Sequence, residues 1–151
     1  MAKVQGQKLL IGSTGELPID VIEEYAKESA VLIAPNFASG MRMLYQILET
    51  LRQSEVSKFE TKIEDTHHIH KKDSPSGTAL RMETLLRNNG IDAVIHSERS
   101  GEELGVHAFI LKNEYEQLSI SHKVLSRDVY AQGCLELISE LILLEKGLHM
   151  R

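Results

Sequence analysis

The chain has 151 residues, 42% of them hydrophobic, which is enough to bury one core of ordinary size. Its 17 basic and 22 acidic residues give a net charge of -5, which argues against a nucleic-acid binder that relies on a general positive field. The single cysteine, Cys134, cannot form an internal disulfide framework and is expected to be a small buried hydrophobe. No stretch approaches the roughly 20 apolar residues of a membrane helix. We therefore expect a cytoplasmic protein with neither a nucleic-acid nor a membrane partner.

The first part of the chain predicts a strand, a helix and a second strand. Residues 8–12 (KLLIG) are a short apolar run closed by glycine, as in a buried strand. Residues 18–28 place apolar side chains at helical spacing behind Pro18, which suits a first helical turn. Residues 30–34 (AVLIA) predict a second buried strand, parallel to the first. A parallel sheet of two strands needs cover or partners from elsewhere.

The middle of the chain predicts a helix followed by a strand. Ser39 is placed to cap a helix that runs to about residue 53. The apolar stripe expected on its inner face contains Met41, Leu44, Ile47, Leu48 and Leu51. Residues 58–66 then alternate between apolar and charged, which is typical of a half-buried strand.

The remaining elements complete a mixed pattern. A helix is expected to begin at Ser76 or Thr78 and to end at residues 88–90, followed by a short strand at 91–96. Residues 106–112 and 117–124 predict a hairpin, and residues 129–146 a closing apolar helix. The side chains expected inward on that helix are Cys134, Leu137, Ile138, Leu141 and Ile142. The fold class is therefore α+β, with a mixed four-stranded sheet.

A dense cationic cluster follows the predicted strand that ends at residue 66. His67, His68 and His70 are followed at once by Lys71 and Lys72. If the strand continues, its alternation places His67 and Lys71 on one face. An imidazole beside an ammonium group is a proton-donor pair that also holds a dianion.

The turn after the cluster suggests an anion site. Residues 73–78 (DSPSGT) lead into a helix, whose first N–H groups and positive dipole attract a carboxylate. Gly77 lets a ligand approach the backbone closely, and Ser76 and Thr78 add hydroxyl donors. The alternative is that Ser76 or Thr78 only caps the helix while Pro75 fixes the turn.

Two further interpretations of the cluster stay open. The histidines could be metal ligands, but zinc needs further donors, and no sequence pattern gathers Asp65, His96, His107 and His122 around them. We therefore assign no metal. The histidines could also form a solvated edge of mixed charge with no ligand.

The stretch THHIHKKDSPSGTA closely resembles the signature E-x-H-H-R-H-K-x-D-A-P-S-G-T-A of dihydrodipicolinate reductases (4-hydroxy-tetrahydrodipicolinate reductases). Further motifs of that family follow in the same order: IGSTG at 11–15, APNFASG at 34–40, SERSGEELGVH at 97–107 and SHKVLSRDVYAQG at 121–133. The resemblance covers nearly the whole chain from residue 9.

The resemblance implies a reductase of the lysine and diaminopimelate pathway. Such an enzyme transfers hydride from NADPH or NADH to a cyclic unsaturated dicarboxylate, 4-hydroxy-tetrahydrodipicolinate, and adds a proton. His67 matches the family's proposed general acid, and Lys71 matches the lysine that assists protonation and binds substrate. The residues expected to contact the substrate carboxylates are His68, Ser76, Gly77 and Thr78. The residues that match the nicotinamide end of the cofactor site are Gly12, Thr14, Asn36 and Phe37.

The same resemblance implies a domain order. Residues 1–36 are expected to be a remnant of a Rossmann-type nucleotide-binding domain, and residues 37–127 a substrate-binding domain with helices on one face that forms a homotetramer. Residues 128–151 are expected to return as a helix to the remnant.

The chain departs from the family pattern in its cofactor half. Family members open on a dinucleotide-binding segment G-x-x-G-x-M-G, which this sequence does not contain. Binding of NADPH or NADH is therefore expected to be weakened, or to depend on a separate nucleotide-binding subunit. Asp65 stands where the family prefers glutamate, and Ile69 where it usually has arginine. The alternatives are a non-catalytic relative that acts as a dicarboxylate-binding or scaffold protein and, behind it, a metal-dependent hydrolase.

Overall fold

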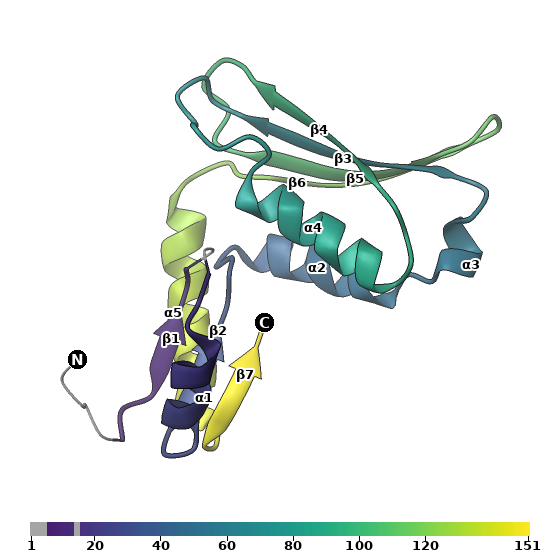
Figure 1. Cartoon of the computed structure of the whole chain (residues 1–151). Coiled ribbons are helices and arrows are strands. Elements are labelled where there is room, and N and C mark those ends of the chain that lie inside the picture. The colour runs from purple at the N-terminus through teal and green to yellow at the C-terminus, as the bar shows by residue number, and fades with distance from the viewer. Residues whose placement is uncertain (1–5, 14–15) are drawn as a thin grey trace. The chain divides into compact units, whose positions relative to one another are not determined.

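The computed structural model describes residues 6–13 and 16–151, and it divides into two compact units (Figure 1). We call them the split unit, made of the described residues of Met1–Ser39 with Asp128–Arg151, and the central unit, Gly40–Arg127. No helix in the described part of the chain is long and apolar enough to cross a membrane.

The split unit is built on a parallel sheet with the strand order β1-β2-β7. Strand β1 (Leu9–Ile11) pairs with β2 (Ala30–Ile33) in parallel, which confirms the two predicted strands and their direction. Strand β7 (Gly147–Met150) pairs in parallel with the other side of β2 and was not predicted. Its sequence, GLHM, is not a continuous apolar run like those of β1 and β2, so this strand is recognisable only from its partner. The third strand supplies part of the cover that the two-stranded sheet needed.

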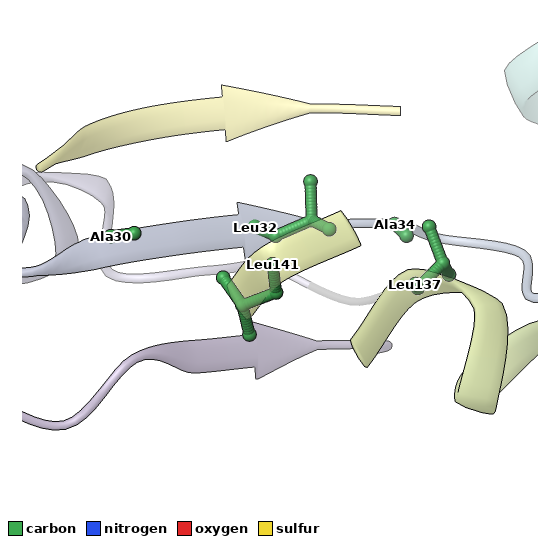
Figure 2. Close-up of a cluster of buried hydrophobic side chains, with 5 residues drawn as sticks. All are labelled: Ala30, Leu32, Ala34, Leu137 and Leu141. Atoms are coloured by element: carbon green, nitrogen blue, oxygen red, sulfur yellow. The ribbon is translucent and has the colours of Figure 1, made fainter. Parts of the chain in front are cut away.

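A helix covers each face of this sheet. Side chains alternate along β2, so the residues of one face contact α1 (Ile19–Ala26) and those of the other face contact α5 (Asp128–Leu143). On the α1 side, Ile22 and Ala26 pack against Val31 and Ile33. On the α5 side, the core contains Ala30, Leu32, Ala34, Leu137 and Leu141 (Figure 2). Burial on both faces explains why β2 is apolar throughout.

The inner face of α5 is narrower than predicted. Leu137 and Leu141 are buried, but Ile138 and Ile142 are 40% and 64% exposed, and Cys134 is only half-buried. Residues four apart lie on one stripe of a helix, and here only that stripe reaches β2. The prediction that Ile138 and Ile142 point inward is therefore wrong for the described unit.

The central unit is a mixed four-stranded sheet with the order β4-β3-β5-β6, which confirms the predicted α+β class. Its strands are β3 (Glu60–His67), β4 (Val94–Arg99), β5 (Val106–Lys112) and β6 (Gln117–Lys123). Strands β3 and β4 are parallel, and the pairs β3–β5 and β5–β6 are antiparallel. Helices α2 (Ser39–Thr50) and α4 (Gly77–Asn88) lie on one face of the sheet (Figure 1).

The predicted hairpin and helices of this unit are confirmed, with shifts at their ends. Ser39 is the first residue of α2 and not the residue that precedes it, and a short unpredicted helix, α3 (Gln53–Val56), follows. Strand β4 begins three residues later than predicted, because the N–H of Ile91 still donates to the carbonyl of Leu86 in α4. The buried stripe of α2 is Met41, Leu44, Tyr45 and Leu48. Ile47 is 39% exposed and Leu51 half-buried, so their predicted burial is wrong.

The packing of α5 on β2 gives a matched stability test. Leu137 is 1% exposed and Leu135, on the same helix, is 66% exposed. Leu137→Ala is expected to lower the free energy of unfolding by about 2–5 kcal/mol, because it leaves a cavity beside Leu32. Leu135→Ala is expected to change it by less than about 0.5 kcal/mol. Urea unfolding of both variants measures the difference, and equal losses would contradict the packing of α5 described above.

Candidate functional site

Strand pairing collects polar side chains on the helix-covered face of the central sheet. Asp65 on β3 lies beside Ser97 on β4 and His107 on β5, and His107 lies beside His122 on β6. These four residues form a polar row across the sheet. His67, two residues after Asp65 on β3, points to the same face and lies beside Arg99.

Asp65 is the centre of this row, and its side chain is fully buried. Its Oδ2 accepts hydrogen bonds from the Ser76 N–H (2.9 Å), from Ser97 Oγ (3.1 Å) and from Arg99 Nη2 (3.0 Å). Its Oδ1 lies 3.0 Å from His67 Nδ1 and 3.3 Å from His107 Nε2. Burial alone would raise the pKa of Asp65, but the contacts with His107, His67 and Ser76 outweigh it and hold the pKa far below its usual range. Asp65 is therefore a buried anion at neutral pH.

The two histidines of β5 and β6 behave differently from Asp65. Burial lowers the pKa of His107 more than the neighbouring Asp65 raises it, and His67 lowers it further. Burial also lowers the pKa of His122, and His107 adds to that effect. The ring of His107 meets the ring of His67 edge to face, with the centroids 5.0 Å apart. His107 is therefore a neutral imidazole packed against His67.

Ser76, His107 and Asp65 are adjacent without forming a hydrolytic triad. A triad uses both nitrogens of the imidazole, one toward serine and one toward aspartate. Here Ser76 Oγ and Asp65 Oδ1 both face His107 Nε2, at 3.2 and 3.3 Å. Ser76 Oγ also accepts a hydrogen bond from the Ala79 N–H, which confirms Ser76 as the cap of α4. Its predicted contact with a substrate carboxylate stays a prediction.

The cationic cluster forms a turn and not an extended strand. Strand β3 ends at His67, so the predicted alternation of faces beyond it is wrong. The backbone folds back because the Lys71 N–H donates to the carbonyl of His68, whose own N–H donates to Glu103. Lys71 Nζ lies 2.8 Å from Asp73 Oδ1, a contact that lowers the pKa of Asp73. The Lys71 side chain is 24% exposed, so this cation lies at the edge of the buried cluster.

The predicted substrate-binding residues lie on both sides of this turn. His68 is half-buried and Ile69 is 58% exposed. Gly77 and Thr78 are the first two residues of α4, the end of the helix with the positive dipole. The central unit therefore holds His67, His68, Lys71, Gly77 and Thr78 within one turn and the two elements that flank it.

Sequence reasoning did not assign a role to Asp65 or Arg99. Arg99 Nη1 donates to the Asp65 carbonyl (3.1 Å) and its Nη2 donates to the Asp73 carbonyl (2.5 Å), so it joins β3 to the turn. Two signals were available. Asp65 and His67 are two residues apart in a strand, and Arg99 opens the R-x-G motif.

Three donors at this site could hold a cation. One ligand atom each from Asp65, His67 and His107 lies within 4.8 Å of the others, although no sequence pattern gathered them. The guanidinium of Arg99 already balances the charge of Asp65. A buried dication would add two uncompensated positive charges there, which is costly. The charges around Asp65, His67 and His107 therefore disfavour a zinc ion at this cluster.

The predicted cofactor residues belong to the split unit. Gly12 directly follows β1 and Asn36 follows β2, so both lie at the carboxyl edge of a parallel sheet, where ligands of such sheets bind. A Cβ added to Gly12 would lie 2.5 Å from the ring of Phe37, and Asn36 Oδ1 accepts from the Ala38 N–H. Thr14 lies outside the described residues. The part of these residues in cofactor binding stays a prediction.

Comparison with known proteins shows that the relatives of this chain are oxidoreductases. The family model described as "Dihydrodipicolinate reductase, C-terminus" matches residues 40–150, so the chain belongs to this family, and the resemblance inferred from the motifs is confirmed. Proteins named 4-hydroxy-tetrahydrodipicolinate reductase from Nitrosomonas europaea and Methanocaldococcus jannaschii are 31% and 30% identical over 95% and 99% of the chain. The chain spans 62% of the length of each.

The solved structures show the same fold. A dihydrodipicolinate reductase from Paenisporosarcina sp. TG-14 has a TM-score of 0.76 at 20% identity, over 95% of this chain and 62% of its own. The mixed sheet with its covering helices is therefore the fold of this family.

The neutral state of His107 predicts a pH dependence of stability. The unfolded chain takes up a proton on His107 near its ordinary pKa of about 6.5, whereas the folded chain takes it up only at lower pH. The stabilisation is therefore complete above that pH and is lost as the pH falls below it. The free energy of unfolding is expected to fall from about pH 7 to about pH 5, and to fall less steeply in His107→Gln. His70→Gln, at an exposed position, is the control and should keep the wild-type slope. An unchanged slope in His107→Gln would contradict the assignment.

Proposed function

We propose that this chain carries the substrate-binding and protonating part of a 4-hydroxy-tetrahydrodipicolinate reductase of the lysine and diaminopimelate pathway. In this reaction hydride from NADPH or NADH reduces a cyclic unsaturated dicarboxylate, and His67 supplies the proton. The observation that carries the proposal is the pairing of His67 with the buried, ionised Asp65, at the strand end from which the turn with Lys71 leaves. A proton donor and a cation so placed suit a dianionic substrate.

Lys71 and the start of α4 supply the groups that would hold the carboxylates. Lys71 is paired with Asp73, whose side chain is 55% exposed. A substrate carboxylate can replace that exposed partner and keep the ammonium neutralised. The second carboxylate would lie at the start of α4, where the helix dipole favours an anion, beside Gly77, Thr78 and the ring of His68. The reductase of Paenisporosarcina was solved with dipicolinate, a cyclic dicarboxylate, bound, which supports this ligand class.

For the cofactor, we propose that Gly12, Thr14, Asn36 and Phe37 meet the nicotinamide end of NADPH or NADH. Binding would be weak, or would depend on a separate nucleotide-binding subunit.

We further propose a homotetramer that covers the sheet face opposite α2 and α4, where Val94 is 72% exposed. A cytoplasmic location fits the same pathway.

A second candidate is a non-catalytic dicarboxylate-binding or scaffold protein. The observation that favours it is that the proposed carboxylate ligands all belong to the central unit. They could hold a dicarboxylate without any contribution from the proposed cofactor residues.

Titration with pyridine-2,6-dicarboxylate tests the ligand site. Lys71→Met is expected to weaken binding by roughly 10- to 100-fold, because it removes a charge-assisted hydrogen bond. Lys72→Met, at the exposed neighbouring position, is the control and should bind as the wild type does. Isothermal calorimetry measures both, with thermal unfolding as a check of the fold. Equal affinity of Lys71→Met and the wild type would remove Lys71 from the site.

Titration with NADPH and NADH separates the two candidates. Cofactor binding at micromolar affinity, strengthened by pyridine-2,6-dicarboxylate, is expected if the chain works as a reductase. Dicarboxylate binding without detectable cofactor binding would favour the binding protein, or the need for a nucleotide-binding subunit. Absence of dicarboxylate binding would contradict both.

A further inference from the structure

We infer that Asp65 is the positioning residue for His67: its Oδ1 accepts the Nδ1–H of the imidazole, so that Nε2 is the nitrogen that carries the proton for the substrate. This inference rests on the proposed function for the purpose of that proton. The arrangement of the two side chains is independent of it.

The two oxygens of Asp65 have different surroundings. Three donors occupy Oδ2, from Ser76, Ser97 and Arg99. Within the described residues, Oδ1 makes no hydrogen bond of good geometry, and imidazole nitrogens of His67 and His107 lie near it. A buried carboxylate oxygen needs a donor, so at least one of these nitrogens must present a proton to it.

His67 is the histidine best placed to present a proton to Oδ1. Its buried Nδ1 lies 3.0 Å from Oδ1 and has no other hydrogen-bond partner in the part of the chain that the structure describes. Without a proton on Nδ1, a nitrogen lone pair would face a carboxylate lone pair at that distance, which is repulsive. The contact is short but poorly aligned, as catalytic pairs often are before substrate binds. Neutral His67 is therefore the Nδ1–H tautomer, and its Nε2 is the basic nitrogen.

Gly105 borders the Nε2 edge of the His67 ring. The ring edge that carries Nε2 lies against Gly105, where an added Cβ would approach Nε2 to 3.1 Å and Cδ2 to 3.4 Å. Gly105 also has a φ of +156°, so both the lack of space for a Cβ and the backbone conformation favour glycine there. No side chain of residue 105 can therefore cover that edge of the ring.

The charged and titratable groups near the pair of His67 and His107 are Asp65 on β3, Arg99 on β4 and Lys71 on the turn. His107 shares its Nε2 between Asp65 and Ser76, and its Nδ1 is buried without a hydrogen-bond partner. A proton added to Nδ1 of His107 would therefore be an unsatisfied buried charge.

Nitrogen-15 NMR of protein labelled at histidine tests the inference without turnover. At about pH 8 the wild-type His67, assigned with His67→Gln, is expected to be the Nδ1–H tautomer. Asp65→Asn should lose this preference, and Asp65→Glu should retain it, since it keeps the carboxylate. Glu64→Gln, on the opposite face of β3, is the matched control and should retain it too. An Nε2–H tautomer in the wild type would overturn the inference, even if Asp65→Asn does not fold.

Two further measurements keep this inference separate from the proposed function. If the protein turns over substrate, Asp65→Asn should lower kcat by about 100-fold or more with a small change in KM, because orientation and not binding is lost. An unchanged kcat would overturn the inference. Stoichiometric zinc binding that Asp65→Asn abolishes would also overturn it, since a metal would then hold Nδ1. Failure of the wild type to bind a dicarboxylate would instead contradict the proposed function. The tautomer of His67 would still decide the inference.

Discussion

The buried carboxylate of Asp65 is the interaction on which the central unit depends. Removing an ion from water costs several kcal/mol even after the protein relaxes. The cost is offset here by donors from β4, from the cap of α4 and from two histidines. These groups come from β3, β4, β5 and the start of α4, so the charge can be satisfied only when those segments are assembled. The polar row is therefore a constraint on the fold as much as a candidate site.

Arg99 extends this constraint to the turn that carries the proposed substrate cation. Its guanidinium bonds to the carboxylate and the carbonyl of Asp65 and to the carbonyl of Asp73. The turn between β3 and α4 is thus held at one end by its chain connection to His67 and at the other by Arg99. Because Lys71 lies between those points, the backbone of the turn and the contact with Asp73 fix the place of its ammonium group.

Local pattern predicted most of the fold, and its failures were at places set by distant partners. Strands β1 and β2 and the hairpin of β5 and β6 follow from the pattern of apolar residues along the sequence. Strand β7 lacks the continuous apolar run of β1 and β2, and the burial of the outer positions of α2 and α5 depended on how far each helix faces its sheet. The site divides in the same way. His67 and Lys71 lie in one dense motif, whereas the role of Asp65 appears only when cross-strand pairing brings Ser97 and His107 beside it.

The groups that would orient the proton and those proposed for the cofactor belong to different units. His67 and the side chains around it, Asp65, Arg99 and His107, all lie within Gly40–Arg127, while Gly12 and Asn36 follow strands of the split unit. The orientation of the proposed acid therefore does not require a bound nucleotide. A family member that obtains its nucleotide from a separate subunit could keep the proton side of the reaction unchanged, since each side chain that holds His67 in place comes from the same sheet or from the turn that leaves it.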